Sequence, residues 1–430
     1  MPPVTAVDAN DENDRTALMI AAQKGRVQVA RALLEAGAAV NAQNEQGWSA
    51  LMLAALNGHE QVARALIEAK ANLEAQQNQG FTSLMLSAQN GHEQVARALL
   101  EAKAAFDTRE AMGNTALNKA SENGHEQCVK ALLEAGAAVD LAENAGFTPL
   151  MSASQNGHDL CARALLEAGA AVDTQNNEGV TALMLAAING HDLCARALLE
   201  AGARVKAQMP NGATALMISC QYGHEQVARA LLEAGADVNK EWPQGFSSLM
   251  VACQYGHVLV ARALLEAGAD VNAVQQHELK WTALMFAAQN GHEQVARTLL
   301  EAKADLEKQT LKGTTALMLS AQNGHVQVAR ALLKAGANVN AANQRGSTAL
   351  TLCCQNGHEL LARALLEAKA NLEAQMNSGH TALLLSAQNG HEQVARALLE
   401  AGAAVDYMTP NGSTALMLAC QNGHEQVARA

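Results

Sequence analysis

The histidines are the residues of this chain whose spacing first suggests chemistry. Twelve of the fourteen follow a glycine and recur at a near-constant interval, as at His59, His92 and His125. A column of imidazoles could hold a metal or relay protons, but metal ligands must converge within ~2–2.5 Å of one ion. Stacked helical units lie ~10 Å apart, and HEQVA lacks the second histidine of the HExxH zinc motif. We therefore interpret these histidines as turn residues at helix junctions and expect no metal site.

Eight cysteines raise the alternative of disulfides or a second kind of metal site. They replace Val or Ala of a repeated segment, which are small apolar positions: Cys128, Cys161, Cys194, Cys220, Cys253, Cys353, Cys354 and Cys420. Equivalent positions ~10 Å apart are too distant for a disulfide, whose Cα atoms lie within about 7 Å. We expect buried, reduced thiols that act as small hydrophobic side chains, which is typical of a reducing compartment.

No other arrangement of side chains indicates catalysis. The chain contains neither GxxxxGK[ST] nor GxGxxG, the glycine-rich loops that hold phosphates. No Ser, His and Asp set and no pair of carboxylates stands out from the repeated background. We expect no catalytic residues and no cofactor.

One segment of 33 residues fills the sequence. Its opening Thr or Ser lies at Thr16, Ser49, Thr82, Thr115, Thr148, Thr181, Thr214, Ser247, Thr282, Thr315, Thr348, Thr381 and Thr414. A fixed period of this length predicts stacked units that bury their apolar faces on one another. We predict a disordered lead-in over residues 1–5 and thirteen repeats over residues 6–430. The last repeat is incomplete, which favours a fragment of a longer protein.

The copy that begins at Thr82 shows the elements of one repeat. Thr82 fits a helix N-cap, and a first helix of about nine residues ends at Gly91. A second helix opens at Glu93 and carries Val95, Leu99 and Leu100 at helical spacing on its buried face. Arg97 lies four residues from both Glu93 and Glu101, which predicts a charge ladder along the exposed side. The polar stretch to residue 113 predicts an extended loop or β-hairpin.

These motifs resemble the ankyrin repeat. The best copy, with Pro149, reads TPLMSASQNGHDLCARALLEAGAAVD, and this pattern of TPL, GH and LLEAG recurs in register, with substitutions, in thirteen copies over residues 6–430. The resemblance implies an all-α solenoid of stacked helix–turn–helix units with β-hairpin loops. It also implies binding of other proteins through a concave face of hairpin tips and first helices.

Two departures from the family pattern affect stability. Met replaces the family's His after TPL in ten copies, with Asn118, Thr351 and Leu384 in the others, so we expect looser packing between repeats. Lys replaces the Gly after the second helix in four copies, at Lys70, Lys103, Lys303 and Lys369. In the left-handed conformation each lysine costs about 1 kcal/mol.

Composition excludes several classes of function. The net charge of −12 argues against nucleic acid, which needs a surplus of Lys and Arg. No apolar run reaches the ~18 residues of a membrane span, and the start is not a secretory signal. We predict a monomeric, non-catalytic protein–protein interaction scaffold of the cytoplasm or nucleus. The alternatives are the regulatory or targeting part of a larger enzyme or channel truncated at Ala430, and a mechanical spacer.

Candidate partner-binding residues lie where the copies differ. Aromatic residues precede the repeat's opening Thr or Ser at Trp48, Phe81, Phe147, Phe246 and Trp281, a position that faces the binding groove in ankyrin proteins. With Tyr222, Trp242 and Tyr255, Phe246 and Trp281 form a dense group in repeats seven to nine, where a two-residue insertion lies in segment 275–280. Packing on the neighbouring hairpin, or drift among similar copies, would also explain them. Asn239 and Asn272 resemble the asparagines that asparaginyl hydroxylases modify in ankyrin repeats.

Overall fold

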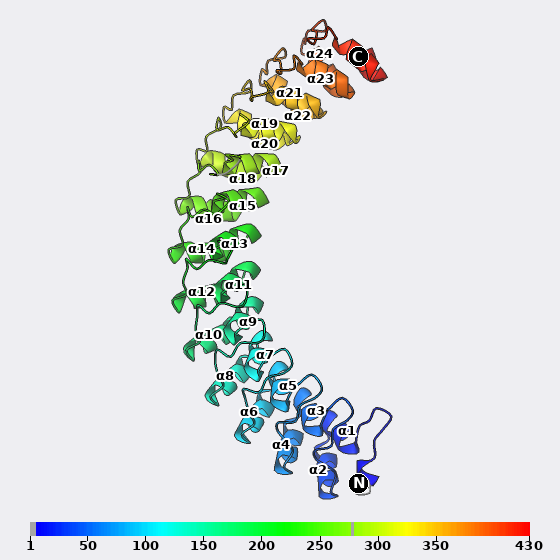
Figure 1. Cartoon of the computed structure of the whole chain (residues 1–430), viewed down its shortest axis with the longest axis vertical. Coiled ribbons are helices and arrows are strands. Elements are labelled where there is room, and N and C mark those ends of the chain that lie inside the picture. Colours follow the sequence, from blue (N-terminus) through cyan, green and yellow to red (C-terminus); the bar gives the residue numbers. More distant parts are fainter. Residues whose placement is uncertain (1–5, 277–278) are drawn as a thin grey trace. The chain divides into compact units, whose positions relative to one another are not determined.

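The structure is a computed structural model that describes residues 6–276 and 279–430. These residues contain 26 α-helices in thirteen successive pairs, preceded by one 3₁₀ helix, η1 (Ala6–Asp8). The chain divides into two compact units, residues 1–210 and 211–430. Within each unit, first helices pack on first helices and second helices on second helices (Figure 1). The predicted all-α stack is confirmed, whereas the predicted lead-in over residues 1–5 lies outside the described residues.

The first unit holds six helix pairs. Its first helices are α1 (Ala17–Gln23), α3 (Ala50–Leu56), α5 (Ser83–Gln89), α7 (Ala116–Glu122), α9 (Pro149–Asn156) and α11 (Ala182–Asn189). Its second helices are α2 (Val27–Glu35), α4 (Glu60–Glu68), α6 (Glu93–Glu101), α8 (Glu126–Glu134), α10 (Asp159–Glu167) and α12 (Asp192–Glu200).

The second unit holds seven helix pairs. Its first helices are α13 (Ala215–Tyr222), α15 (Ser248–Tyr255), α17 (Ala283–Asn290), α19 (Ala316–Gln322), α21 (Ala349–Gln355), α23 (Ala382–Asn389) and α25 (Ala415–Gln421). Its second helices are α14 (Glu225–Glu233), α16 (Val258–Glu266), α18 (Glu293–Glu301), α20 (Val326–Lys334), α22 (Glu359–Glu367), α24 (Glu392–Glu400) and α26 (Glu425–Arg429).

Each first helix begins at a hydroxyl residue, as the sequence predicts. Thr82 Oγ1 accepts a hydrogen bond from the backbone N–H of Met85 at 3.3 Å, which satisfies one of the N–H groups left free at a helix start. At the other end Asn90 Nδ2 donates to the Leu86 carbonyl at 2.8 Å. Gly91 then takes a positive φ of 74°. The first helices have seven or eight residues, fewer than predicted, because this side-chain cap and the glycine end them early.

A histidine precedes every second helix except α2, and it connects two repeats. His92 Nε2 lies 3.0 Å from the Leu56 carbonyl oxygen, at the C-terminal end of the preceding first helix. A carbonyl only accepts, so Nε2 carries the hydrogen and satisfies a group left free at that helix end. A Cβ at Gly58 would lie 2.5 Å from His92 Nδ1, so the glycine leaves room for the ring. The same bond recurs at His59, His125, His158, His191, His257, His292, His325, His358, His391 and His424.

The core lies at the contacts between repeats. Leu84 and Met85 of α5 and Leu99 of α6 are fully buried, and α5 packs on α3 and α7 as well as on α6. Burying such a side chain contributes about 1.5–3 kcal/mol. Asn118 takes the place of a buried Met without loss of hydrogen bonding, because its Oδ1 accepts from the Thr115 N–H at 3.0 Å.

The loops between repeats are narrow turns. After α4, Gln77 N–H donates to the Phe81 carbonyl at 3.2 Å, and Gly80 N–H donates to the Gln77 carbonyl at 2.7 Å. Within the described ranges, β-structure is limited to isolated bridges, for example Gln43 with Ser49. Successive tips are also joined, because Asn78 N–H donates to the Gln46 carbonyl at 3.1 Å. The predicted hairpin loops are therefore short, and they stand in register from one repeat to the next.

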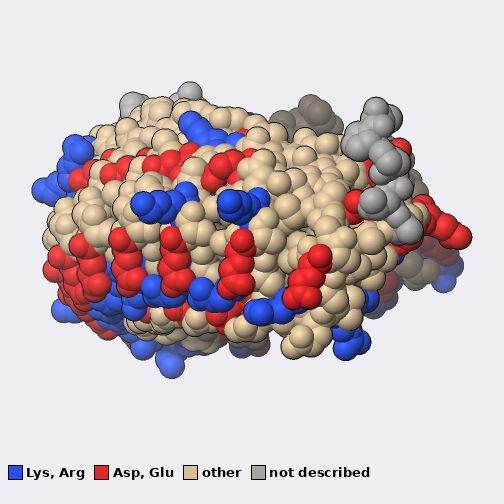
Figure 2. Space-filling view, turned by 90° about the horizontal axis from the view of Figure 1, so that it is seen from below, with Lys and Arg blue, Asp and Glu red and all other residues tan. Residues whose placement is uncertain are grey.

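The charge ladder runs between repeats. Arg97 binds Glu93 at 2.8 Å, as its spacing predicts, but its second partner is Glu134 of the next repeat at 2.8 Å. Glu101 instead pairs with Arg64 of the preceding repeat. Hydrogen bonds to Glu93 and Glu134 raise the pKa of Arg97. Figure 2 shows rows of acidic side chains beside basic ones on the face that it presents. Exposed ion pairs contribute little individually, so apolar packing carries most of the stability.

The cysteines are free thiols, and seven of the eight are buried. Burial raises the pKa of Cys128, Cys161 and Cys194 to about 12, because a thiolate loses its hydration in an apolar position. The prediction of burial is wrong for Cys420, which is exposed. In the described chain no first helix packs on the far side of α25.

Four lysines adopt the left-handed conformation that the repeat pattern predicts. Lys70, Lys103, Lys303 and Lys369 have φ between 63° and 68°. At the equivalent Gly37 and Gly169 an added Cβ would meet nothing within 4 Å, so a side chain fits there. The cost of each lysine therefore lies in the backbone alone.

Lys103→Gly is expected to raise the free energy of unfolding by about 0.5–1 kcal/mol, because it removes this backbone strain. Gly169→Lys, which introduces the same strain where space is free, should lower it by a similar amount. Equilibrium denaturation with urea measures both. A lower stability of Lys103→Gly would contradict the assigned conformation.

Thiol accessibility provides a second test. In the native protein a thiol-specific reagent should modify Cys420 rapidly and the other seven cysteines only as the chain unfolds, because buried protonated thiols are unreactive. Because burial raises the pKa of these thiols, their contribution to the free energy of unfolding is fully present below about pH 9 and declines as the pH rises toward about 12. Mass spectrometry of modified peptides checks the first expectation. Rapid labelling of Cys161 in the native state would show that its position is open.

Candidate partner-binding surface

Turns and first helices lie together on one face of each unit, and this face carries the predicted aromatic anchors. The residue before each opening Thr or Ser closes its turn through the backbone, as Phe246 does by accepting from Trp242 N–H at 2.9 Å. Its side chain is thereby held beside the first helix that follows. The aromatic residues at this position are all half-buried: Trp48, Phe81, Phe147, Phe246 and Trp281.

Three rings of the second unit form an aromatic cluster, which consists of Phe246, Trp281 and Phe286. The Phe286 ring lies 5.5 Å from Phe246 and 4.9 Å from Trp281 between centroids, tilted by 37° and 43°. Tilted rings at such separations attract one another beyond their buried area. Phe286 belongs to α17 and is 8% exposed, so it forms the fixed base on which the two predicted anchors pack.

An apolar cavity of about 150 Å³ opens beside this cluster. We call it the aromatic cavity. Its lining residues come from repeats seven and eight: Gln221, Trp242, Gln244, Phe246, Val251, Gln254 and Tyr255. The indole nitrogen Nε1 of Trp242 is buried and has no hydrogen-bond acceptor among the described residues. A buried donor without an acceptor is costly.

The two tyrosines of the predicted group occupy different surroundings. Tyr255 lines the aromatic cavity, whereas Tyr222 does not, although its neighbour Gln221 does. Both rings stack on a histidine, Tyr222 on His224 and Tyr255 on His257, at 6.2 Å between centroids. They are 52% and 50% exposed, so about half of each side chain remains available to a partner.

The remaining candidates lie in the first unit and do not form one cluster. Trp48 lines a cavity of about 460 Å³ and Phe147 lines another of about 360 Å³. The Lys119 ammonium lies 6.0 Å from the centroid of the Phe81 ring, within the range of a cation–π contact. Both cavities contain carboxylates, Glu45 in the first and Glu143 in the second.

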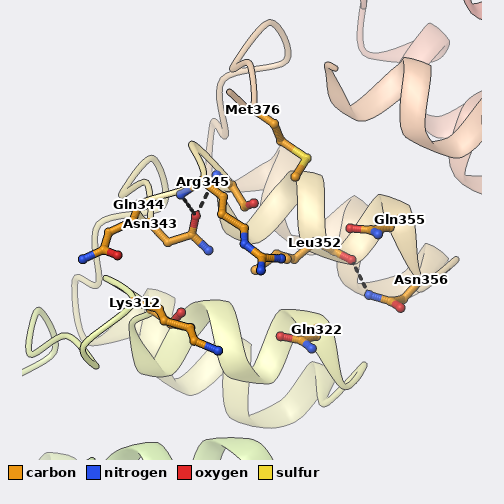
Figure 3. A pocket seen from close by; sticks show the side chains of 11 residues that line it. Lys312, Gln322, Asn343, Gln344, Arg345, Leu352, Gln355, Asn356 and Met376 are labelled. Carbon is orange, nitrogen blue, oxygen red and sulfur yellow. Dashed lines mark hydrogen bonds between the residues drawn. The ribbon is translucent and has the colours of Figure 1, made fainter. Parts of the chain in front are cut away.

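A second cavity in the second unit has a different chemistry. It measures about 570 Å³ and lies on the same face, between the turns and first helices of repeats ten to twelve. We call it the cationic cavity, because Lys312 and Arg345 line it together with Thr, Ser, Asn and Gln side chains and with no carboxylate. Figure 3 shows both basic side chains extending from their turns toward the first helices.

The turn that carries Arg345 is held rigidly. Asn343 Oδ1 accepts from the backbone N–H groups of Arg345 at 2.9 Å and Ser347 at 3.0 Å. The turn before it is tied to this one, because Gln344 N–H donates to the Lys312 carbonyl at 3.0 Å. Neither basic side chain forms an ion pair with a described residue.

The candidate modification sites have a structural task. Asn239 Oδ1 accepts from the Asp270 N–H at 2.9 Å, and Asn272 Oδ1 accepts from the Asp305 N–H at 2.8 Å. Each asparagine thus joins one repeat to the next. Hydroxylation of these residues stays a prediction.

The described residues contain no group of three or more His, Cys, Asp or Glu side chains that could hold a metal ion. Of the described helices, none has the length and apolar composition needed to cross a lipid bilayer.

Sequence reasoning missed Phe286 and the two basic residues. Phe286 stands where the next repeat has Leu319. The repeat pattern therefore predicts only that Phe286 is buried in the core, and it does not predict the contact with Trp281. The signal available was its distance of five residues from Trp281. Lys312 and Arg345 precede the glycine of successive turns. Aligning the repeats would have shown that these two basic residues occupy equivalent, adjacent positions of the stack.

Comparison with known proteins gives one family. The sequence model described as ankyrin repeats (3 copies) matches residues 4–77, 37–109, 70–143, 135–209, 169–242, 202–275, 240–310, 284–376, 337–408 and 368–430. A search of curated proteins gave no match. The chain is similar to the crystal structure of the human ASB11 ankyrin repeat domain, with 32% identity, a TM-score of 0.47, and coverage of 52% of this chain and 99% of that one.

Phe286→Ala is expected to lower the free energy of unfolding by about 3 kcal/mol, because it empties a buried position beneath two rings. Phe286→Leu, which copies the neighbouring repeats, should cost less than about 1.5 kcal/mol. Denaturant titration of both variants checks the difference. An unchanged free energy of unfolding in Phe286→Leu would mean that the ring contacts with Phe246 and Trp281 add nothing to stability.

Proposed function

The chain belongs to the ankyrin-repeat family, and from this premise we propose that it is a non-catalytic scaffold that binds partner proteins. Ankyrin repeats generally mediate protein–protein interaction. We place the main docking surface on the turns and first helices of repeats seven to nine, around the aromatic cavity. Trp48, Phe81 and Phe147 are proposed as additional contacts in the first unit.

The observation that carries this proposal is the aromatic cavity, which is lined by Trp242, Phe246 and half-exposed Tyr255. Rigid aromatic side chains that border a cavity are the usual anchors of protein interfaces. The cavity is too small for a drug-sized ligand, which typically needs about 300–1,000 Å³, but a single apolar side chain fits it. This favours a protein partner over a small molecule.

We further propose that the scaffold acts in a reducing compartment, the cytoplasm or the nucleus. The support is chemical: eight cysteines are unpaired, and seven of them are buried. Disulfides form and persist in oxidising compartments.

The test of the scaffold function is affinity capture from native lysate with the wild type and with Tyr222→Ala/Trp242→Ala/Tyr255→Ala. Recovery of the bound partners should fall at least about tenfold, because truncating anchor aromatics costs about 2 kcal/mol or more. The matched control is Leu259→Ala/Leu360→Ala, which removes exposed apolar side chains from the second helices α16 and α22 and should leave recovery unchanged. Unchanged recovery with the aromatic variant, at an unchanged melting temperature, would dismiss this docking surface.

A further inference from the structure

We propose that the partner segment is acidic: an extended stretch of a protein whose apolar side chain enters the aromatic cavity and whose carboxylates bind Lys312 and Arg345 in the cationic cavity. This inference rests on the proposed scaffold function and adds the chemistry of the partner. It joins two cavities of the second unit that the sequence pattern did not connect.

The two cavities are built from equivalent positions of the repeat. Phe246, Val251 and Gln254 line the aromatic cavity, and the matching residues three repeats later, Ser347, Leu352 and Gln355, line the cationic cavity. Residues at equivalent positions of a stack lie on the same face. One ligand that runs along the first helices α15, α17, α19 and α21 therefore passes both cavities.

Charge selects the kind of ligand. The chain has 42 acidic and 30 basic residues, yet neither cavity of the second unit is lined by a carboxylate. In the corresponding cavities of the first unit carboxylates outnumber the single basic residue: Glu12, Asp14 and Glu45 against Arg15 in one, and Glu122 and Glu143 against Lys119 in the other. A negatively charged segment is thus repelled where those carboxylates lie and attracted where Lys312 and Arg345 lie.

The basic side chains are available for this task. Neither forms an ion pair within the described residues, unlike the arginines of the second helices. A guanidinium can bind one carboxylate through two parallel hydrogen bonds. Side-chain amides of Gln322, Gln355 and Asn356 surround them and can donate to the remaining carboxylate oxygens.

Distance sets the length of the ligand. Three repeat steps of about 8–10 Å separate the cavities by roughly 24–30 Å. An extended chain spans about 3.3 Å per residue, so roughly eight residues lie between the apolar side chain and the carboxylates.

The probe is a fluorescein-labelled peptide with a Leu-Phe pair separated from a short run of Glu by about seven Gly and Ser residues, made in both chain directions. Its counterpart carries Gln in place of Glu. Fluorescence anisotropy with the full chain should give a Kd at least about tenfold lower for one of the Glu peptides than for its Gln counterpart. This preference should weaken as salt rises from about 0.05 M to about 0.5 M, since exposed charges are then screened.

Matched variants assign the effect to its residues. Lys312→Gln/Arg345→Gln should abolish the preference for Glu, whereas Lys334→Gln, an exposed cation on the second helix α20 of the same region, should leave it intact. Trp242→Ala should weaken both peptides equally. Equal binding of the Glu and Gln peptides, a preference that survives Lys312→Gln/Arg345→Gln, or no binding of either peptide overturns the acidic ligand. The scaffold function would then still be judged by the lysate experiment alone.

Discussion

Contact between equivalent helices of adjacent repeats is the interaction on which this protein depends. A first helix of seven or eight residues is too short to be stable alone, and its Leu and Met side chains are buried only because neighbouring first helices cover them. The histidine hydrogen bond to the preceding repeat helps to fix the orientation of one repeat on the next. It pairs the imidazole donor with a backbone carbonyl that the preceding helix leaves free. At α25, the last first helix that the structure describes, Leu416 and Met417 are each 57% exposed. The equivalent Leu84 and Met85, which have a first helix on each side, are only 1% exposed. Burial of a first helix therefore depends on the helices packed against it.

This dependence separates the residues that hold the stack from those that can vary. Thr caps, turn glycines and histidines are committed to bonds within or between repeats, and the cysteines fill small apolar positions. The residue before each turn glycine and the one before each opening Thr are not so committed, since their backbones close the turn whatever the side chain. These positions therefore accept aromatic residues such as Trp281 and basic residues such as Arg345, and the two units have cavities of different charge at equivalent positions.

Local features were accessible from the sequence because they depend on residues close in the chain. The caps at Thr82 and its equivalents, the positive φ of Lys103 and the buried thiols all follow from one copy of the repeat. The partner of Arg97 did not, because spacing within a helix cannot distinguish Glu101 of the same helix from Glu134 of the next repeat. Phe286 was missed for a related reason, since its importance lies in rings contributed by other turns and not in its own position. Cys420 is exposed because, among the described helices, no first helix packs on the far side of α25. This cannot be predicted from the residue's position within one repeat.

A docking surface made from several repeats inherits the same dependence on neighbours. A segment that contacts repeats eight to eleven touches turns joined by backbone bonds such as Gln344 N–H to the Lys312 carbonyl, so it binds residues whose spacing is already set. A ligand that binds only the stacked state stabilises it in proportion to the logarithm of its concentration over Kd. Since opening any one of these contacts would break the continuous surface, such a ligand opposes separation of every repeat that it spans. Recognition by the turns and cohesion of the helices are thus coupled through the same nearest-neighbour contacts.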